Sequence, residues 1–348
     1  MLLKRIKYEW SNFTKAEFNK FKIKKYTIND DNKLLIAIKK DRSRIIEFIN
    51  NTDIKLNITK IEHGLNDKIK LYGKGHFIDM NIHNVLDTIP YEYTVIWNGN
   101  NKMHIKCTVN QYESFKQRLG LMIHLLEYIR TTSEHKDRIM NIYLILTPLT
   151  KSYPKTHIIK VPNVNTGYTD FNENIIFIWR YEEFEKVLLH EVIHYFDKDC
   201  RDLNYDDVLP GIKINDGNSV HNDERYYEAY TDFYAIYYHL IYLSLVTRVK
   251  IKHILSMELT FIRNQAQQVN KHLQLGDWSI TPSNIINQDT SAFSYYIIKY
   301  LIFDYVLHNG INELKDYSKL LYKITNDGFK SIEPIKTEYL RMSLLQLS

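Results

Sequence analysis

Apolar and polar positions follow two different periods along this chain. Between about residues 68 and 179 short apolar or alternating runs predict strands, whereas beyond residue 180 apolar positions recur every three or four residues, which predicts helices. Helical spacing also occurs earlier, at 15–24 and 41–50. Residues 1–66 carry no recognisable chemistry, so we treat them as an N-terminal extension whose role is open.

The expected strands cover residues 68–72, 93–97, 103–109, 141–146, 157–161 and 174–179. Asn98-Gly99 separates two of them and favours a tight hairpin, because both turn positions need a positive φ. Residues 162–167 are expected to form a loop between the last two strands. A helix at 111–131 has apolar residues at three- and four-residue spacing and should pack one face against the sheet.

Five helices are expected after the strands, at 182–198, 223–246, 251–273, 290–308 and 311–325. The chain is therefore predicted to be an α+β protein. Residues 67–200 would supply a mixed sheet, its backing helix and one further helix, and residues 201–348 an all-helical subdomain of the same domain.

The composition is that of a folded globular protein. Of 348 residues 25% are charged and 44% hydrophobic, and only 11 glycines and 7 prolines occur, so no long linker is evident. The net charge of +5 is spread along the chain. Its densest basic run, 15–25, is interrupted by Phe18, Phe21 and Ile23 and is best explained as a solvated helix face, so we expect no nucleic-acid partner.

Cys107 and Cys200 form neither a disulfide framework nor a CxxC pair, which favours a reducing compartment. The first residues lack a signal-peptide core, and the most apolar stretch, 234–246, is too short to span a bilayer. We expect no membrane insertion, and an intracellular (cytoplasmic) or virion-associated protein. Abundant Lys, Ile, Asn and Tyr indicate an AT-rich gene, such as that of a large DNA virus, a protist or a bacterium.

The motif His190-Glu191-Val192-Ile193-His194 lies in the first of the expected C-terminal helices. Residues four apart share a helix face, so His190 and His194 can bind one metal ion with Glu191 beside it. Zinc at such a site lowers the pKa of a bound water to about 7, and Glu191 would then act as the general base.

A catalytic zinc normally has three protein ligands, so a third donor is needed. Glu228 and Asp232 share one face of the next helix. Glu228 can reach the metal while Asp232 accepts the second ring N–H of a ligand histidine. Asp197, Glu224 and His221 are the alternative third ligands.

The order of strand, HEVIH helix, loop and EAYTD helix over about residues 174–232 resembles the gluzincins, the thermolysin-like zinc metallopeptidases. The resemblance implies a zincin-like fold with His190, His194 and Glu228 as zinc ligands. It implies Glu191 as base and Asp232 as the outer acceptor. It also implies that strand 174–179 is a sheet edge along which an extended peptide lies.

Related enzymes place a Tyr or His, which stabilises the oxyanion, some sixty to seventy residues beyond the glutamate ligand. Tyr295 and Tyr296 lie at that distance, and both are candidates for this role. His239, three helical turns beyond Glu228, is expected to be a core histidine with its hydrogen bonds satisfied. The acidic loop containing Asp199, Asp206, Asp207 and Asp216 is expected to be solvated rather than to bind calcium.

These features predict a zinc metallopeptidase that hydrolyses a peptide or protein substrate. One alternative is a zincin-fold protein whose metal site is retained for a binding or virion structural role. Another is a non-enzymatic protein in which the motif is accidental. Oligomeric state and the choice between endo- and exopeptidase are not readable from the sequence.

Overall fold

The computed structural model describes residues 10–21, 26–61, 65–72, 78–203, 212–222, 224–277 and 285–348. Its largest element is a mixed six-stranded sheet with the order β1-β2-β3-β4-β6-β5. The strands are β1 (Asn57–Ile61), β2 (Tyr91–Trp97), β3 (Asn101–Cys107), β4 (Asn141–Thr147), β5 (Gly167–Asp170) and β6 (Ile175–Arg180). β3, β4 and β6 are parallel, and the outer pairings are antiparallel.

The hairpin between β2 and β3 forms at the expected turn. Asn98 and Gly99 have φ values of 43° and 82°, as the Asn-Gly dipeptide predicts. Strand β1 pairs with β2 from Asn57 to Ile61, so the segment expected to be an N-terminal extension supplies an edge strand of the same sheet.

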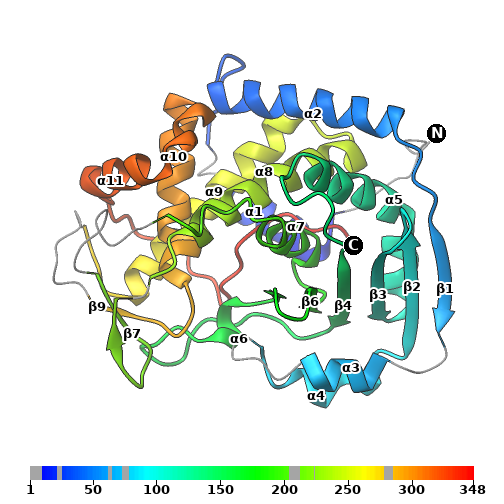
Figure 1. Cartoon of the computed structure of the whole chain (residues 1–348). Coiled ribbons are helices and arrows are strands. Elements are labelled where there is room, and N and C mark those ends of the chain that lie inside the picture. The colour runs from blue at the N-terminus through cyan, green and yellow to red at the C-terminus, as the bar shows by residue number, and fades with distance from the viewer. Residues whose placement is uncertain are drawn as a thin grey trace.

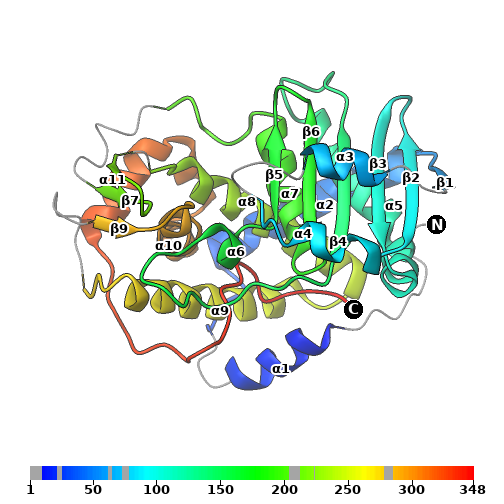
Figure 2. The ribbon, with the colours of Figure 1, turned by 90° about the horizontal axis from the view of Figure 1, so that it is seen from below.

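Helices cover both faces of the sheet, which explains why β4 and β6 are apolar without alternation. Ile142 and Leu144 face the main core, whereas Tyr143 and Ile145 face a smaller cluster beneath α3 (Leu65–Tyr72) and α4 (Ile82–Val85). Figure 2 shows α3 and α4 on their own side of the sheet.

The main core lies between the sheet and a set of long helices. They are α2 (Lys33–Asn51), α5 (Val109–Thr131), α7 (Phe184–Tyr195), α8 (Tyr227–Thr247), α9 (Ile251–His272) and α10 (Lys299–Asn309). In Figure 1, α2 crosses the molecule above the others. It packs against α5, α8, α9 and α10, so residues 33–51 join the sheet-bearing part to the helical part. The shorter helices are α1 (Asn12–Phe21), α6 (Val161–Val164) and α11 (Tyr317–Asp327).

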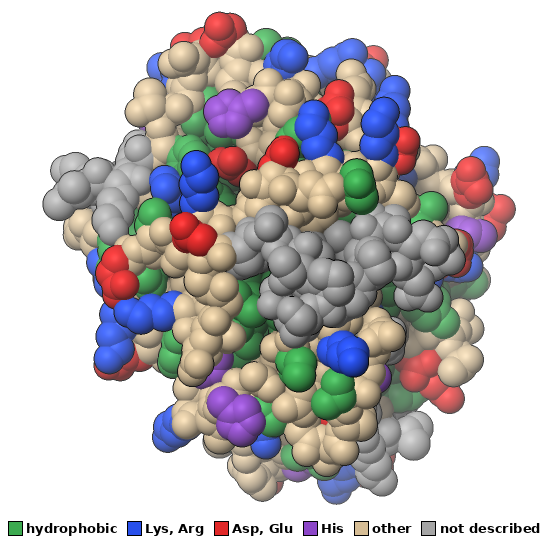
Figure 3. All heavy atoms as spheres, turned by 90° about the vertical axis from the view of Figure 1, so that its left-hand side faces the viewer, with side chains coloured by type: hydrophobic (Ala, Val, Ile, Leu, Met, Phe, Trp, Pro, Cys, Tyr) green, Lys and Arg blue, Asp and Glu red, His purple; other side chains and the backbone are tan. Residues whose placement is uncertain are grey.

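The C-terminal part is not all-helical as predicted. Three short strands, β7 (Lys213–Asn215), β8 (Val220–His221) and β9 (Ile285–Asn287), form a second sheet at the opposite end of the molecule from β1 (Figure 2). Strands of two or three residues leave no period in the sequence, so the pattern missed them. Charged side chains of both signs are mixed on the face seen in Figure 3.

Two predicted strands are wrong. Residues 68–72 belong to helix α3, because Leu65, Ile69 and Tyr72 are spaced as one helix face and pack into the smaller cluster. Residues 157–161 make one isolated bridge, from Ile159 to Gln288. Pro162 then stands near the start of the short helix α6.

Within the described ranges, no helix combines the length and apolarity needed to cross a membrane. His239 is buried in the core as predicted, but its Nε2 has no hydrogen-bond partner in the described part of the chain. Burial lowers the pKa of this imidazole to about 3, so it is neutral at physiological pH. The predicted start of α8 at residue 223, the end of α1 at 24, and Asp206 and Asp207 lie outside the described residues.

Candidate metal centre

Helix α7 places the two histidines of the motif inside the molecule. All twelve of its residues are buried, and it packs against α8 and against strands β5 and β6. Its apolar side chains fill the core on most sides, so His190 and His194 project together toward the start of α8. The four-residue spacing therefore has the expected consequence, since the ring centroids lie 4.6 Å apart.

Three donor atoms meet at one point between α7 and α8. Nε2 of His190 and Nε2 of His194 are 3.0 Å apart, and each lies 3.1 Å from Oε2 of Glu228. Donors held about 2.1 Å from a tetrahedral zinc ion lie about 3.4 Å from one another, so this triangle needs little expansion to accept the ion. Among the described residues, these three are the one group of His, Cys, Asp or Glu able to hold a metal.

A carboxylate orients each histidine from behind. Nδ1 of His190 lies 3.0 Å from Oδ1 of Asp232, as predicted, and Nδ1 of His194 lies 2.5 Å from Oδ2 of Asp199. Both contacts favour protonated Nδ1 and leave Nε2 as the atom that faces the centre. Asp199, expected in a solvated loop, is 1% exposed and also pairs with Arg201.

The charges of His194, Glu228 and Asp199 stabilise one another. Burial would lower the pKa of His194, but Glu228 and Asp199 raise it to about 10. Burial would raise the pKa of Glu228, but the two histidines hold it below its usual range. Without a metal, His194 is therefore protonated opposite an ionised Glu228, and metal binding has to displace that proton.

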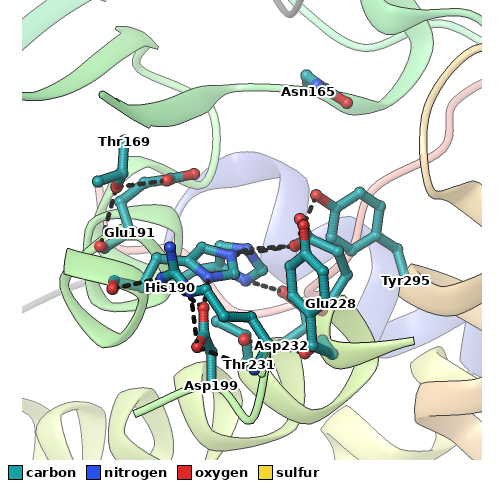
Figure 4. A network of polar contacts seen from close by, with 12 residues as sticks. Asn165, Thr169, His190, Glu191, Asp199, Glu228, Thr231, Asp232 and Tyr295 are labelled. Carbon is teal, nitrogen blue, oxygen red and sulfur yellow. Dashed lines mark hydrogen bonds and ion pairs between the residues drawn. The ribbon is translucent and has the colours of Figure 1, made fainter. Parts of the chain in front are cut away.

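Glu191 stands beside the triangle and is not part of it. Its Oε2 accepts a hydrogen bond of 2.9 Å from the Thr169 hydroxyl on β5. Burial raises the pKa of the Glu191 carboxyl, which favours a role as proton acceptor near neutral pH. Figure 4 shows Glu191 turned toward Thr169 on one side of His190, with Glu228 and Tyr295 on the other.

The structure separates the two candidate tyrosines. Tyr295 donates a hydrogen bond of 3.0 Å to Oε2 of Glu228 and borders the cavity at the triangle. Burial and the neighbouring Glu228 raise its pKa far above 10, so the phenol keeps its proton. Tyr296 instead donates to the Leu340 carbonyl at 2.9 Å in the core and does not border this cavity, so it is not placed for the chemistry.

An open cavity of about 200 Å³ gives access to the three donors. Strand β5 forms one wall through Gly167, Tyr168 and Thr169, and Tyr227 and Tyr295 border it from the helical side. Its lining also includes Asn165, Phe171, Arg201, Arg225, Thr290 and Ser291. The triangle is thus exposed on the side of Glu191 and closed behind by the outer carboxylates.

None of the alternative third ligands reaches the triangle. Asp197 pairs with Arg138 at 2.6 Å, and His221 lies 3.8 Å from Asp216 near the small sheet. Glu224 accepts hydrogen bonds from Ser294 and Gln288 in the core. The Glu224 carboxylate is thus held by residues 288 and 294 and not by the histidines.

The strand expected at the sheet edge is not the edge. β6, which contains residues 175–180, is paired on both sides, and the missed strand β5 forms the edge beside α7. Residues 162–167 were expected to be a loop, and Gly167 in fact begins this strand. The four residues of β5 alternate too briefly to be recognised in the sequence.

Three polar residues of the site were missed in the sequence or given no role there: Asp199, Lys186 and Lys299. Asp199 reaches back to His194 because the chain turns at Asp197 and Cys200, which both have positive φ values. Neither residue type predicts a positive φ at these positions. Lys186 is one helical turn before His190, so the sequence already places both on one helix face. A lysine is nevertheless expected to face solvent, so it was given no role.

Comparison of the chain with protein-family models, curated proteins and solved structures gives no match to any of them. The site is therefore interpreted from its own geometry and from the motifs in the sequence.

Proposed function

We propose that this protein is a zinc-dependent metallopeptidase of the gluzincin type, with His190, His194 and Glu228 as zinc ligands. The observation that carries the proposal is the triangle of Nε2, Nε2 and Oε2 atoms, open on the side where Glu191 lies. Zinc prefers nitrogen and carboxylate donors in this number when its fourth position is left for water or substrate.

Each remaining residue has a place in peptide hydrolysis. Zinc, when bound, would lower the pKa of a water and polarise the scissile carbonyl. Glu191 would accept the proton of the attacking water and pass it to the leaving amine. Tyr295 would turn its phenolic O–H from Glu228 to the oxygen that becomes negative in the tetrahedral intermediate. Asp232 and Asp199 would hold the two imidazoles in place.

Strand β5 is suited to bind the substrate backbone. It is the edge of the large sheet, it borders the cavity, and its Thr169 contacts Glu191. An extended peptide added antiparallel to an edge strand satisfies its own backbone hydrogen bonds and brings one carbonyl to the metal. This proposal transfers the expected substrate groove from β6 to β5.

A retained metal site with a purely binding role is the main alternative. A structural zinc site is normally closed by four protein ligands. Here the triangle has three, and the fourth direction leads to the cavity and to Glu191. The open position therefore favours catalysis.

The test combines metal content with hydrolysis. Wild-type protein should bind about one zinc per chain, Glu228→Ala should bind it at least tenfold more weakly, and Glu191→Gln should bind it normally but hydrolyse no peptide. Asp197→Asn is the matched control, because Asp197 is an acidic residue near the motif that does not reach the triangle. Hydrolysis that survives in Glu191→Gln, or a wild type without zinc, would contradict the proposal.

A further inference from the structure

Asp232, the outer partner of His190, is held by two buried lysines. Lys186 forms an ion pair with its Oδ1, and Nζ of Lys299 lies 2.6 Å from its Oδ2. The exposed fractions of the three residues are 0%, 1% and 0%, in the order Lys186, Lys299 and Asp232. Ionised groups are costly to bury. The stability of the fold alone therefore does not explain why two buried cations surround one carboxylate.

The three residues come from different elements and meet only behind His190. Lys186 is one turn before His190 on α7, Lys299 begins α10, and Asp232 is one turn beyond Glu228 on α8. Both lysines also contact Met342, since Nζ of Lys299 donates to its carbonyl at 3.0 Å and Nζ of Lys186 lies 3.3 Å from its sulfur. The buried segment 340–347 thus packs against this cluster through Met342.

The division of the two carboxylate oxygens constrains the geometry. Oδ1 receives Lys186 and Nδ1 of His190, and Oδ2 receives Lys299. If Lys299 were absent, Oδ2 would be buried without a partner. The carboxylate would then rotate toward another partner, which weakens the contact that holds the His190 ring.

We propose that Lys186 and Lys299 are positioning residues that hold Asp232, and through it His190, in the orientation needed to bind metal. This inference rests on the metal centre of the proposed function. A ligand histidine is usually paired with a carboxylate. Here two cations hold that carboxylate in turn, and both cations contact Met342. The carboxylate behind the other ligand histidine has a simpler arrangement, because among the described residues Asp199 pairs with one cationic side chain besides His194, that of Arg201.

The test measures metal affinity rather than activity. Co²⁺ binding is titrated, and its visible absorption spectrum recorded, for wild type, Lys299→Met and Lys299→Arg. Lys299→Met keeps the length of the side chain but loses the charge, and should weaken Co²⁺ binding about tenfold or more and change the spectrum. Lys299→Arg can still donate to Oδ2 and should stay within about threefold of wild type.

A matched control separates positioning from stability. Lys106 is also a buried lysine, 2.8 Å from Glu92, but its pair contacts none of the three metal-binding residues. Lys106→Met should lower the thermal stability of the metal-free protein yet bind Co²⁺ as wild type does. Circular dichroism of each metal-free variant checks that it is folded.

The outcomes distinguish this inference from the proposed function. A wild type that binds no Co²⁺ or Zn²⁺ would defeat the metal centre itself. If wild type binds and folded Lys299→Met binds equally well, the positioning role is overturned while the metal centre stands. If Lys299→Met does not fold, Lys299→Arg tests the positioning role. The arginine variant keeps the positive charge, so weak Co²⁺ binding and an altered spectrum in folded Lys299→Arg would overturn that role.

Discussion

Single residues at this site differ sharply in role from their neighbours. Tyr295 and Tyr296 are adjacent and both buried in large part, yet one phenol contacts Glu228 and the other contacts a backbone carbonyl in the core. Side chains that follow each other on a helical turn point in different directions, and here only Tyr295 faces the cavity. This pair therefore provides its own internal control.

Tyr295→Phe should lower kcat about a hundredfold and leave zinc content unchanged, because it removes a donor to the developing oxyanion but no ligand. Tyr296→Phe should cost about 1 kcal/mol of stability through the lost hydrogen bond to Leu340 and leave kcat near wild type. Steady-state kinetics and zinc analysis check both. Equal kcat values in the two variants would remove Tyr295 from the mechanism.

At the scale of elements, two features bring the chain to the site. Residues 293–298 form a π-helical turn, η3, directly before α10. Such turns are wider than an α-helix and are often found at functional sites. Here the turn brings the Tyr295 hydroxyl into contact with Glu228. Lys299, four residues later, contacts Asp232.

The second feature is the close approach of β5 to α7. A Cβ atom added to Gly167 would lie 2.5 Å from Cδ1 of Ile178, 2.9 Å from Cγ1 of Val187 and 3.2 Å from Cγ of Glu191. Ile178 and Val187 are buried in the core and have little room to move. Glycine at this position therefore sets how near the edge strand lies to Glu191.

Gly167→Ala should displace β5 from α7, costing about 1–3 kcal/mol of stability and lowering kcat/KM for peptides. Gly276→Ala is the control. Gly276 has a φ of +67° with open space around it, so alanine there should cost stability through the backbone but leave kcat/KM unchanged. Urea unfolding and peptide hydrolysis measure the two effects. A fully active Gly167→Ala would show that the strand can move without consequence.

At the scale of the whole molecule, buried ionisable groups make stability depend on pH. Burial raises the pKa of Glu224 to about 7, although hydrogen bonds from Ser294 and Gln288 oppose the shift. A carboxyl whose pKa is higher in the folded than in the unfolded state stabilises the fold fully below its unfolded pKa. That contribution is lost as pH rises through the folded pKa.

Glu224→Gln should therefore gain stability relative to wild type as pH rises from about 4.5 to 7, by about 3 kcal/mol at most, and show a constant difference above pH 8. Urea unfolding of both proteins, stripped of metal with a chelator, measures this difference at each pH. Parallel pH dependences for the two proteins would show that Glu224 does not titrate in this range.

The sequence by itself determined which side chains share a helix face at the candidate metal centre. Spacing on a single helix decides which side chains share a face. The four-residue interval therefore places His190 and His194 on one face of α7, and the same interval places Glu228 and Asp232 on one face of α8. The long elements, α2, α5, α8 and α9 among them, were predicted in type because their apolar periods span several turns. Their ends were less well placed, since helix ends depend on caps and neighbouring contacts.

Only the tertiary structure decided what lies between elements. Asp199 reaches His194 through a turn, whereas Lys186 and Lys299 reach Asp232 through the packing of α7, α8 and α10. Glu228 was separated from the alternative candidates because its carboxylate meets both histidines. The sheet edge beside α7 is β5 rather than the predicted β6, because a four-residue strand has too little alternation to be recognised but still completes a sheet. Local periodicity fixes directions along one element, whereas distances between elements result from how the whole core packs.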